Sequence, residues 1–278
     1  MAGRLEFLSE WLTEAIKYDL EVVIVHDKQD PETSRELRTL IFNCKNPKIQ
    51  LIEGFFGNPG SARNAGLELV SGNWIVFWDS DDLPQIDKIL NETYVARNEV
   101  EVVIGQYEVI NLKTGIVSSD GEHKSIQDVA MNPALWRMIF KSESIQGVRF
   151  PSLRMAEDQV FLSRIRIAEK RIQFTSSVFY KYHTGVSSQL TNSKDALSDL
   201  PKAIRQINCY AKVGSSNQLK FDIFLITRQL ITALTKAPLP SKISAVIEIS
   251  RLGHNRRLIS AWYLVKSVLY IVSHRKGR

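Results

Sequence analysis

A short apolar run that ends abruptly in carboxylates constrains this chain more than any other feature. Residues 74–78 are all apolar and strand-forming, and three of the next four residues, 79–82, are aspartates. Such a run, rich in β-branched and aromatic residues, predicts a buried strand, and Pro84 prevents that strand from continuing. Open α/β sheets bind ligands outside the carboxyl ends of their strands, so the sequence predicts a site at the end of a central strand.

The aspartates Asp79, Asp81 and Asp82 are close enough in sequence to repel one another. A hard cation relieves that repulsion, and carboxylate oxygens are the ligands that Mg²⁺ or Mn²⁺ prefers. The alternative is a solvated acidic turn, which is the better interpretation of an isolated Asp-x-Asp. The strand before the aspartates and the residues upstream of it favour a metal site.

Helical and strand-like patterns alternate in the first part of the chain. The expected elements are helices over residues 5–19 and 31–42, a third helix that is entered through the turn-rich residues 57–66 and runs to about Val70, and strands over 20–25, 48–52 and 74–78. This alternation predicts an α/β fold with a mostly parallel sheet flanked by helices. From about residue 195 the patterns are all helical. We therefore expect an α/β domain over residues 1–190 and a helical C-terminal region over residues 191–278.

Composition narrows the class of protein. The 278 residues carry a formal net charge of +6, yet no nucleic-acid-binding module is recognisable, so no nucleic-acid partner is expected. Cys44 and Cys209 lie far apart, which favours a reduced protein. Residues 1–10 contain no apolar signal-peptide core, and no uninterrupted apolar span reaches about 18 residues. These features predict a cytoplasmic protein without a lipid-spanning helix.

Three further features could carry chemistry. Arg63 lies in a glycine-rich entry to a helix and would suit a phosphate, although a tight loop with a surface arginine looks the same. Glu157 and Asp158 begin a helix, where acids are also common for helix-dipole reasons; one of them could act as a general base. His183 follows a strand and is a candidate third metal ligand or phosphate contact, or a structural residue.

Taken in order, these segments resemble the family 2 glycosyltransferases with the GT-A fold, of bacterial type. The resemblance covers about residues 5–190 and is carried by residues 21–27, 59–66, 78–82, 157–158 and 180–182. It implies a metal-dependent, hexosyltransferase-type enzyme that moves a sugar from a nucleotide-diphosphate sugar to a hydroxyl of a glycan or lipid-linked acceptor, with inversion. Synthesis of a surface polysaccharide or glycolipid is the expected setting.

The resemblance also implies roles on the donor side. Asp79 and Asp81 match the Asp-x-Asp (DxD) pair that holds Mn²⁺ or Mg²⁺ and the sugar nucleotide, and Asp82 is the adjacent acid. Asp27 matches an acid that contacts the nucleotide base, and Arg63 lies near the donor.

On the acceptor side, Asp158 would be the catalytic base, with Glu157 beside it. Trp136 resembles an aromatic residue that lines the acceptor. These assignments fit the chemistry, because expulsion of a nucleoside diphosphate needs charge stabilisation and the acceptor hydroxyl needs a base.

The chain departs from the family pattern at its beginning. Family members start with a strand, which would precede Leu5 here, and His26 stands where the family usually has an acid. This departure motivates an alternative: a degenerate, non-catalytic homologue that acts as a binding or assembly partner. A metal-dependent phosphohydrolase also fits an aspartate cluster at a strand end.

A basic, aromatic-rich segment closes the chain. Residues around Ile259–Ile271 alternate apolar and aromatic side chains with Lys266, and basic residues flank them. This pattern is typical of an interfacial helix on an anionic membrane and equally of a helix packed on its own domain. The first interpretation predicts a peripheral association with the inner face of the cell membrane.

Overall fold

The computed structural model describes residues 5–28, 31–119, 124–185, 193–211 and 214–253, together with residues 257, 261, 262, 265 and 266. Its contacts divide the chain into two units. The first unit comprises Met1–Lys124, Ala134–Gly147 and Arg171–Ser187, and the second comprises Ser125–Pro133, Val148–Lys170 and Ser188–Arg278. Two segments from before residue 190 thus group with the later helices; the domain boundary at residue 190 stays a prediction.

The first unit alternates helices and strands over its first half, as predicted. Its elements are α1 (Leu5–Lys17), β1 (Val22–Asp27), α2 (Pro31–Cys44), β2 (Ile49–Gly54), α3 (Pro59–Leu67), β3 (Trp74–Val76), β4 (Leu83–Pro84), α4 (Ile86–Val95), β5 (Val102–Asn111), β6 (Val117–Ser119), the 3₁₀ turn η1 (Leu135–Arg137), β7 (Met138–Lys141), α6 (Ser142–Ile145) and β8 (Ile172–Thr184).

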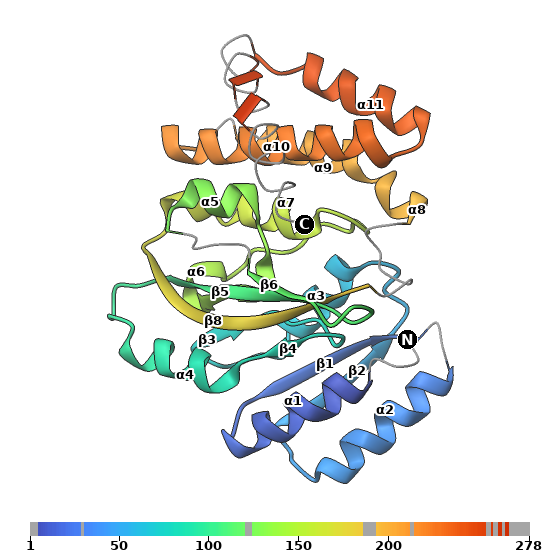
Figure 1. The fold of residues 1–278 in the computed structure, drawn as a ribbon, viewed down its shortest axis with the longest axis vertical. Coiled ribbons are helices and arrows are strands. Elements are labelled where there is room, and N and C mark those ends of the chain that lie inside the picture. Colours follow the sequence, from blue (N-terminus) through green and yellow to red (C-terminus); the bar gives the residue numbers. More distant parts are fainter. Residues whose placement is uncertain are drawn as a thin grey trace. The chain divides into compact units, whose positions relative to one another are not determined.

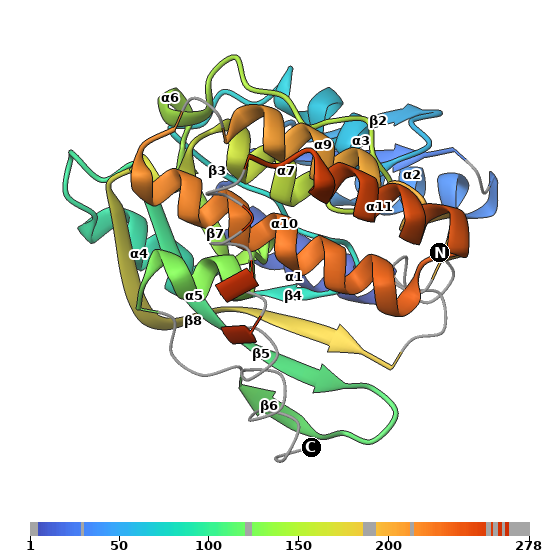
Figure 2. The same cartoon turned by 90° about the horizontal axis from the view of Figure 1, so that it is seen from above.

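These strands form two sheets (Figure 1). β1 pairs in parallel with β2 alone, while a six-stranded sheet has the order β3-β7-β5-β8-β4, with β6 on β5. Within the larger sheet β5 and β8 are parallel, and the remaining pairs are antiparallel (Figure 2). The class is α/β, with a sheet flanked by helices, and the strands after α4 make the larger sheet mixed.

The apolar run before the aspartates differs from its prediction. β3 covers only Trp74–Val76, all partly exposed, and it is the last strand of its sheet rather than a central one. It pairs with β7 on one side only. Because no described strand pairs with its other edge, the run is neither central nor fully buried.

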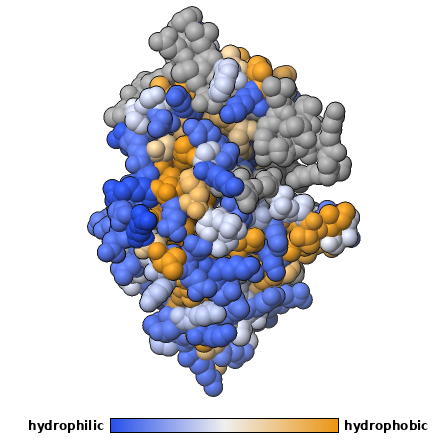
Figure 3. All heavy atoms as spheres, turned by 60° about the vertical axis from the view of Figure 1, so that its left-hand side comes forward, coloured by the Kyte–Doolittle hydropathy of each residue, from blue (hydrophilic) through white to orange (hydrophobic). Residues whose placement is uncertain are grey.

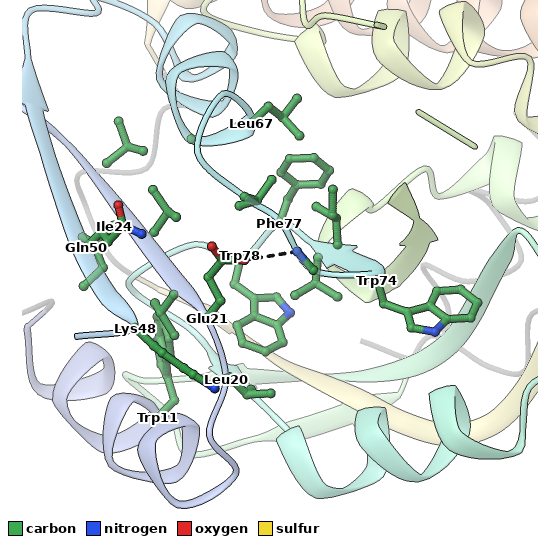
Figure 4. A pocket seen from close by; sticks show the side chains of 18 of the residues that line it. Trp11, Leu20, Glu21, Ile24, Lys48, Gln50, Leu67, Trp74, Phe77 and Trp78 are labelled. Atoms are coloured by element: carbon green, nitrogen blue, oxygen red, sulfur yellow. Dashed lines mark hydrogen bonds between the residues drawn. The ribbon is translucent and has the colours of Figure 1, made fainter. Parts of the chain in front are cut away.

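A cavity of about 810 Å³ lies beside β3, and residues of both β3 and β1 line it (Figure 4). Side chains from α1, α3 and α4, including Trp11 of α1, and Trp78 from the segment after β3 complete its largely apolar wall. Among the described residues no strand pairs with both β1 and β3, and the indole N–H groups of Trp11 and Trp78, which line the cavity, are buried without a hydrogen-bond partner.

Helical spacing explains how α1 joins the core of the first unit. Leu8, Leu12 and Ala15 recur every three to four residues, so they share one face of the helix and are buried. They pack in a cluster with Val22 of β1. Burying a side chain of leucine size contributes roughly 1.5–3 kcal/mol, so this face fixes the helix beside the sheet.

The second unit is helical. It contains α5 (Ile126–Met131), α7 (Glu157–Arg164), η2 (Ile167–Glu169), α8 (Lys194–Leu197), α9 (Leu200–Tyr210), α10 (Ser216–Lys236) and α11 (Leu239–Ser250). α9 contacts α7, α10 and α11. Arg205 of α9 and Arg251 both bind the Glu248 carboxylate of α11, at 2.8 and 2.7 Å.

None of the described helices is long and apolar enough to cross a membrane. The helix predicted around Ile259–Ile271 lies mostly outside the described residues. On the face drawn in Figure 3, hydrophilic side chains predominate, and apolar ones gather in several separate groups.

Candidate active site

The aspartate turn, residues 79–82, connects the end of β3 to β4 in the first unit. β4 pairs antiparallel with β8, with Leu83 opposite Lys181 and Pro84 opposite Tyr180. The turn therefore leads from the edge strand β3 to β4, which pairs with β8. The carboxylates follow a strand, as the sequence predicts, but that strand is an edge strand and ends at Val76, two residues before the turn begins.

Asp82 is the buried member of the turn, with 1% of its surface exposed. Its Oδ1 accepts a hydrogen bond of 2.7 Å from the backbone N–H of His183. Burial raises the pKa of Asp82 to about 8, and repulsion from Asp79 and Asp81 adds to the rise, while the bond from His183 opposes it. Asp82 is thus a buried residue that holds the turn to β8 through its hydrogen bond with His183.

His183 lies against the same turn. Its Nδ1 is 2.8 Å from the backbone carbonyl oxygen of Asp81. Because a carbonyl oxygen can only accept, Nδ1 must carry the proton in this contact. The ring is 4% exposed and packs on Phe7 of α1, with 4.2 Å between ring centroids.

An aromatic stack connects Trp136 to the turn. The indole of Trp136 stacks on Tyr180 and Tyr182, with ring centroids 4.5 and 5.4 Å apart, and meets Tyr107 edge-on. The Tyr180 hydroxyl accepts a bond of 3.0 Å from the backbone N–H of Asp79. Sequence reasoning did not assign a role to Tyr180; the aromatic residues two positions apart on one strand face were the available signal.

Arg63 and Asp79 are brought together by the structure. The Nη2 atom of Arg63 lies 3.3 Å from Oδ1 of Asp79, and both side chains are partly exposed. Asn58 positions the arginine, because its side chain caps α3 by accepting the N–H of Ser61 at 2.8 Å, and Pro59 follows at the first helical position. The predicted donor residues Arg63 and Asp79 are therefore neighbours.

Asp27 ends β1 and holds a loop. Its carboxylate accepts the backbone N–H groups of Phe56 and Gly57, at 3.3 and 2.8 Å. Gly57 has a φ of +67°, a left-handed conformation that favours glycine. The contact of Asp27 with a nucleotide base stays a prediction.

Glu157 and Asp158 belong to the second unit, in the first turn of α7. Glu157 is buried, with 7% exposed, whereas Asp158 is partly exposed. Oδ1 of Asp158 accepts the N–H of Gln159 at 2.8 Å. Ala156 precedes them with a φ of +63°, which is unusual for a residue other than glycine. The more exposed Asp158 is thus the better candidate for a base.

The predicted metal ligands meet the requirements of a cation only in part. No group of three or more His, Cys, Asp or Glu side chains among the described residues is arranged to hold a metal ion. Asp79 and Asp81 offer the carboxylate oxygens that a hard cation prefers, and Asp79 has 42% of its side chain exposed. Two carboxylates suit an ion shared with a diphosphate; the role of His183 as a third ligand stays a prediction.

Several known proteins are similar to this chain in sequence. EpsH of Bacillus subtilis, a putative glycosyltransferase, is 24% identical over 243 residues, which is 78% of this chain and 69% of EpsH. A protein of Haemophilus influenzae described as an uncharacterized glycosyltransferase is 22% identical over 70% of this chain and 77% of its own length. The poly(ribitol-phosphate) β-glucosyltransferase of Bacillus spizizenii is 25% identical over 60% of this chain, which spans only 27% of that enzyme.

The fold is similar to that of a solved enzyme. The structure of residues 1–349 of Staphylococcus aureus TarS in complex with UDP-GlcNAc superimposes with a TM-score of 0.68 at 17% identity, covering 94% of this chain and 84% of that one. This likeness shows the GT-A fold that the sequence predicts. The family model for Glycosyl transferase family 2 matches residues 3–170, more than half of the chain. The chain therefore belongs to glycosyl transferase family 2.

Proposed function

We propose that this chain is an inverting glycosyltransferase that moves a sugar from a nucleotide-diphosphate sugar to a hydroxyl of a glycan or glycolipid acceptor in surface polysaccharide synthesis. The aspartate turn beside Arg63 is the observation that carries this proposal. A cationic fork next to a set of carboxylates suits a diphosphate that binds together with a divalent cation. TarS in complex with UDP-GlcNAc supports a nucleotide-sugar donor, and the names of the relatives support a surface-glycan product.

On the donor side, Asp79 and Asp81 would hold Mn²⁺ or Mg²⁺, which would stabilise the negative charge that develops on the leaving diphosphate. Arg63 would contribute a second positive charge toward the diphosphate. Its ion pair with Asp79 keeps the guanidinium near the turn, where the two opposite charges limit its rotation. Asp27 would support the nucleotide by fixing the loop at Phe56 and Gly57.

On the acceptor side, Asp158 would accept the proton of the attacking hydroxyl. The hydroxyl oxygen forms a bond to the anomeric carbon while the bond from that carbon to the nucleoside diphosphate breaks. The nucleoside diphosphate leaves with the electron pair, and the proton passes to the Asp158 carboxylate. Attack from the face opposite the leaving group inverts the anomeric carbon. Trp136 would present a partly exposed aromatic surface to the acceptor.

The test is donor turnover with Mn²⁺ in purified Asp81→Asn and Asp158→Asn variants. Each should lose at least about a hundredfold in kcat, because each removes a charge that acts in the transition state. Asp87→Asn and Asp195→Asn, at exposed positions on α4 and α8, are matched controls and should keep the wild-type rate. Wild-type turnover in both site variants would refute the assignment, and release of phosphate from simple esters would favour a phosphohydrolase.

We also propose a peripheral association with an anionic membrane through the segment around Ile259–Ile271. Of its described residues, Trp262 and Val265 are exposed, at 59% and 58%, and Lys266 lies over the Trp262 ring. Each basic residue near an anionic surface contributes about 1 kcal/mol, and a buried large apolar side chain roughly 1.5–3 kcal/mol.

Flotation with phosphatidylserine-containing liposomes measures this association. The full chain should float, and a Trp262→Glu, Val265→Glu variant should not. Equal flotation of the two proteins, or none for either, would contradict the proposal.

A further inference from the structure

The aspartate turn is attached to β8 by hydrogen bonds at three of its four residues. Asp79 donates its backbone N–H to the Tyr180 hydroxyl at 3.0 Å, Asp81 accepts Nδ1–H of His183 at 2.8 Å, and Asp82 accepts the His183 N–H at 2.7 Å. These contacts lie next to the antiparallel pairing of β4 with β8, in which Leu83 is opposite Lys181. Two residues of one strand therefore determine the course of the turn.

Both residues of β8 are held rigidly. Tyr180 is fully buried, and its ring stacks on Trp136. His183 is 4% exposed and lies under Phe7. Hydrogen bonds formed away from water are strong, and leaving one partner unsatisfied is costly, so the rings and the turn hold one arrangement together.

We propose that Tyr180 and His183 are positioning residues, which fix the backbone of residues 79–82 and thereby the directions of the Asp79 and Asp81 carboxylates. His183 acts through Nδ1 on the carbonyl oxygen of Asp81, not as a ligand of the cation. The consequence for donor binding rests on the proposed function, whereas the effect on the turn itself does not.

The two ring nitrogens of His183 allow this role to be separated from metal binding. A metal-bound histidine also often donates its other ring N–H to a backbone carbonyl, so the Nδ1 contact alone fits either role. Asparagine can place an amide N–H close to the position of Nδ1 but has nothing at Nε2. Glutamine reaches the position of Nε2 and loses the donor at Nδ1. Positioning predicts that His183→Asn resembles the wild type and that His183→Gln does not; metal ligation predicts the reverse.

Hydrogen exchange of the metal-free protein tests the turn directly. The peptide that covers residues 79–82 should exchange at least about tenfold faster in Tyr180→Phe and His183→Gln, because one lost hydrogen bond changes an opening equilibrium by about that factor, and the Tyr180 hydroxyl also bonds the Asp82 side chain. His183→Asn should stay within about threefold of the wild type. Peptides from β1 and β2 should be unchanged in all variants, which excludes general destabilisation. Equal exchange in the two His183 variants would overturn the proposal.

Calorimetric binding of UDP with Mn²⁺ tests the consequence for the donor. Tyr180→Phe and His183→Gln should weaken binding about tenfold, with His183→Asn close to the wild type. Asp81→Asn reports on the proposed function separately: if it binds UDP with Mn²⁺ as well as the wild type, the donor site is wrongly assigned. Loss of binding in His183→Asn but not in His183→Gln would make His183 a metal ligand and overturn its positioning role.

Discussion

Among the described glycines, Gly105 in the middle of β5 is the one where an added methyl group would meet the closest atoms. A Cβ atom built there would lie 2.4 Å from Cγ and Cδ2 of Phe179 on the neighbouring strand β8, well below the 3.4–4 Å of ordinary contact. Phe179 is fully buried and packs with Val103 and Ile139. The ring would have to move by about 1 Å inside a closely packed core.

The magnitude follows from two opposing effects. Overpacking a core costs about 1–3 kcal/mol, and a displacement this large belongs at the upper end of that range. Replacing glycine by alanine in a strand stabilises the folded state by roughly 0.5–1 kcal/mol, because alanine loses less backbone freedom on folding. We therefore expect Gly105→Ala to lower the free energy of unfolding by about 2 kcal/mol.

Urea unfolding followed by tryptophan fluorescence measures this change. With a slope of about 2 kcal/mol per molar urea, the midpoint should fall by roughly 1 M. Gly253→Ala is the control, because a Cβ there meets no atom of the described residues within 4 Å and Gly253 has no left-handed φ; its midpoint should be unchanged.

A double-mutant cycle identifies the cause. Phe179→Ala alone should cost about 3–5 kcal/mol through the space that it leaves. In the Phe179→Ala background the added methyl group of Gly105→Ala has room, so the double variant should be no less stable than Phe179→Ala. The coupling energy should be about 2 kcal/mol. Strict additivity of the two changes, or a Gly105→Ala variant as stable as the wild type, would refute the reasoning.

Three further predictions concern stability. The pKa of Asp82 is about 8 in the folded protein and near 3.8 in the unfolded chain, so the metal-free protein loses stability as the pH rises between these values. Asp82→Asn should therefore unfold at a higher temperature than the wild type at pH 8. Below pH 3.8 the two proteins should unfold at the same temperature. Glu248→Gln weakens the contact between α9 and α11 that Arg205 makes, and should cost about 1 kcal/mol in thermal unfolding, with Glu143→Gln as a surface control. Trp136→Leu removes three aromatic contacts of about 0.5–1.5 kcal/mol each and should lower the urea midpoint by about 1 M; an unchanged midpoint would mean that the stack contributes nothing.

Local chemistry was enough to predict the class of fold and several elements of the site. The spacing of Leu8, Leu12 and Ala15 identifies α1, because helix periodicity needs only neighbouring residues. The turn-rich residues 57–66 predict the entry to a helix and hence the place of Arg63, and the structure begins that helix, α3, at Pro59. The aspartates after residues 74–78 predict a strand end, because a short apolar run that stops at charged residues is typical of a strand.

Only the tertiary structure decided where these pieces lie in the sheet and what holds them. The apolar run was expected to be a central strand, yet β3 pairs on one side only, because pairing partners are chosen by topology and not by hydrophobicity. Tyr180 and His183 hold the aspartate turn from far along the chain. The bonded pairs Asp79–Tyr180 and Asp82–His183 are each 101 residues apart in sequence. A pattern within a window of some ten to twenty residues carries no information on such contacts. They exist because β4 pairs with β8, and the pairing of such distant residues must offset the entropy cost of closing the loop between them.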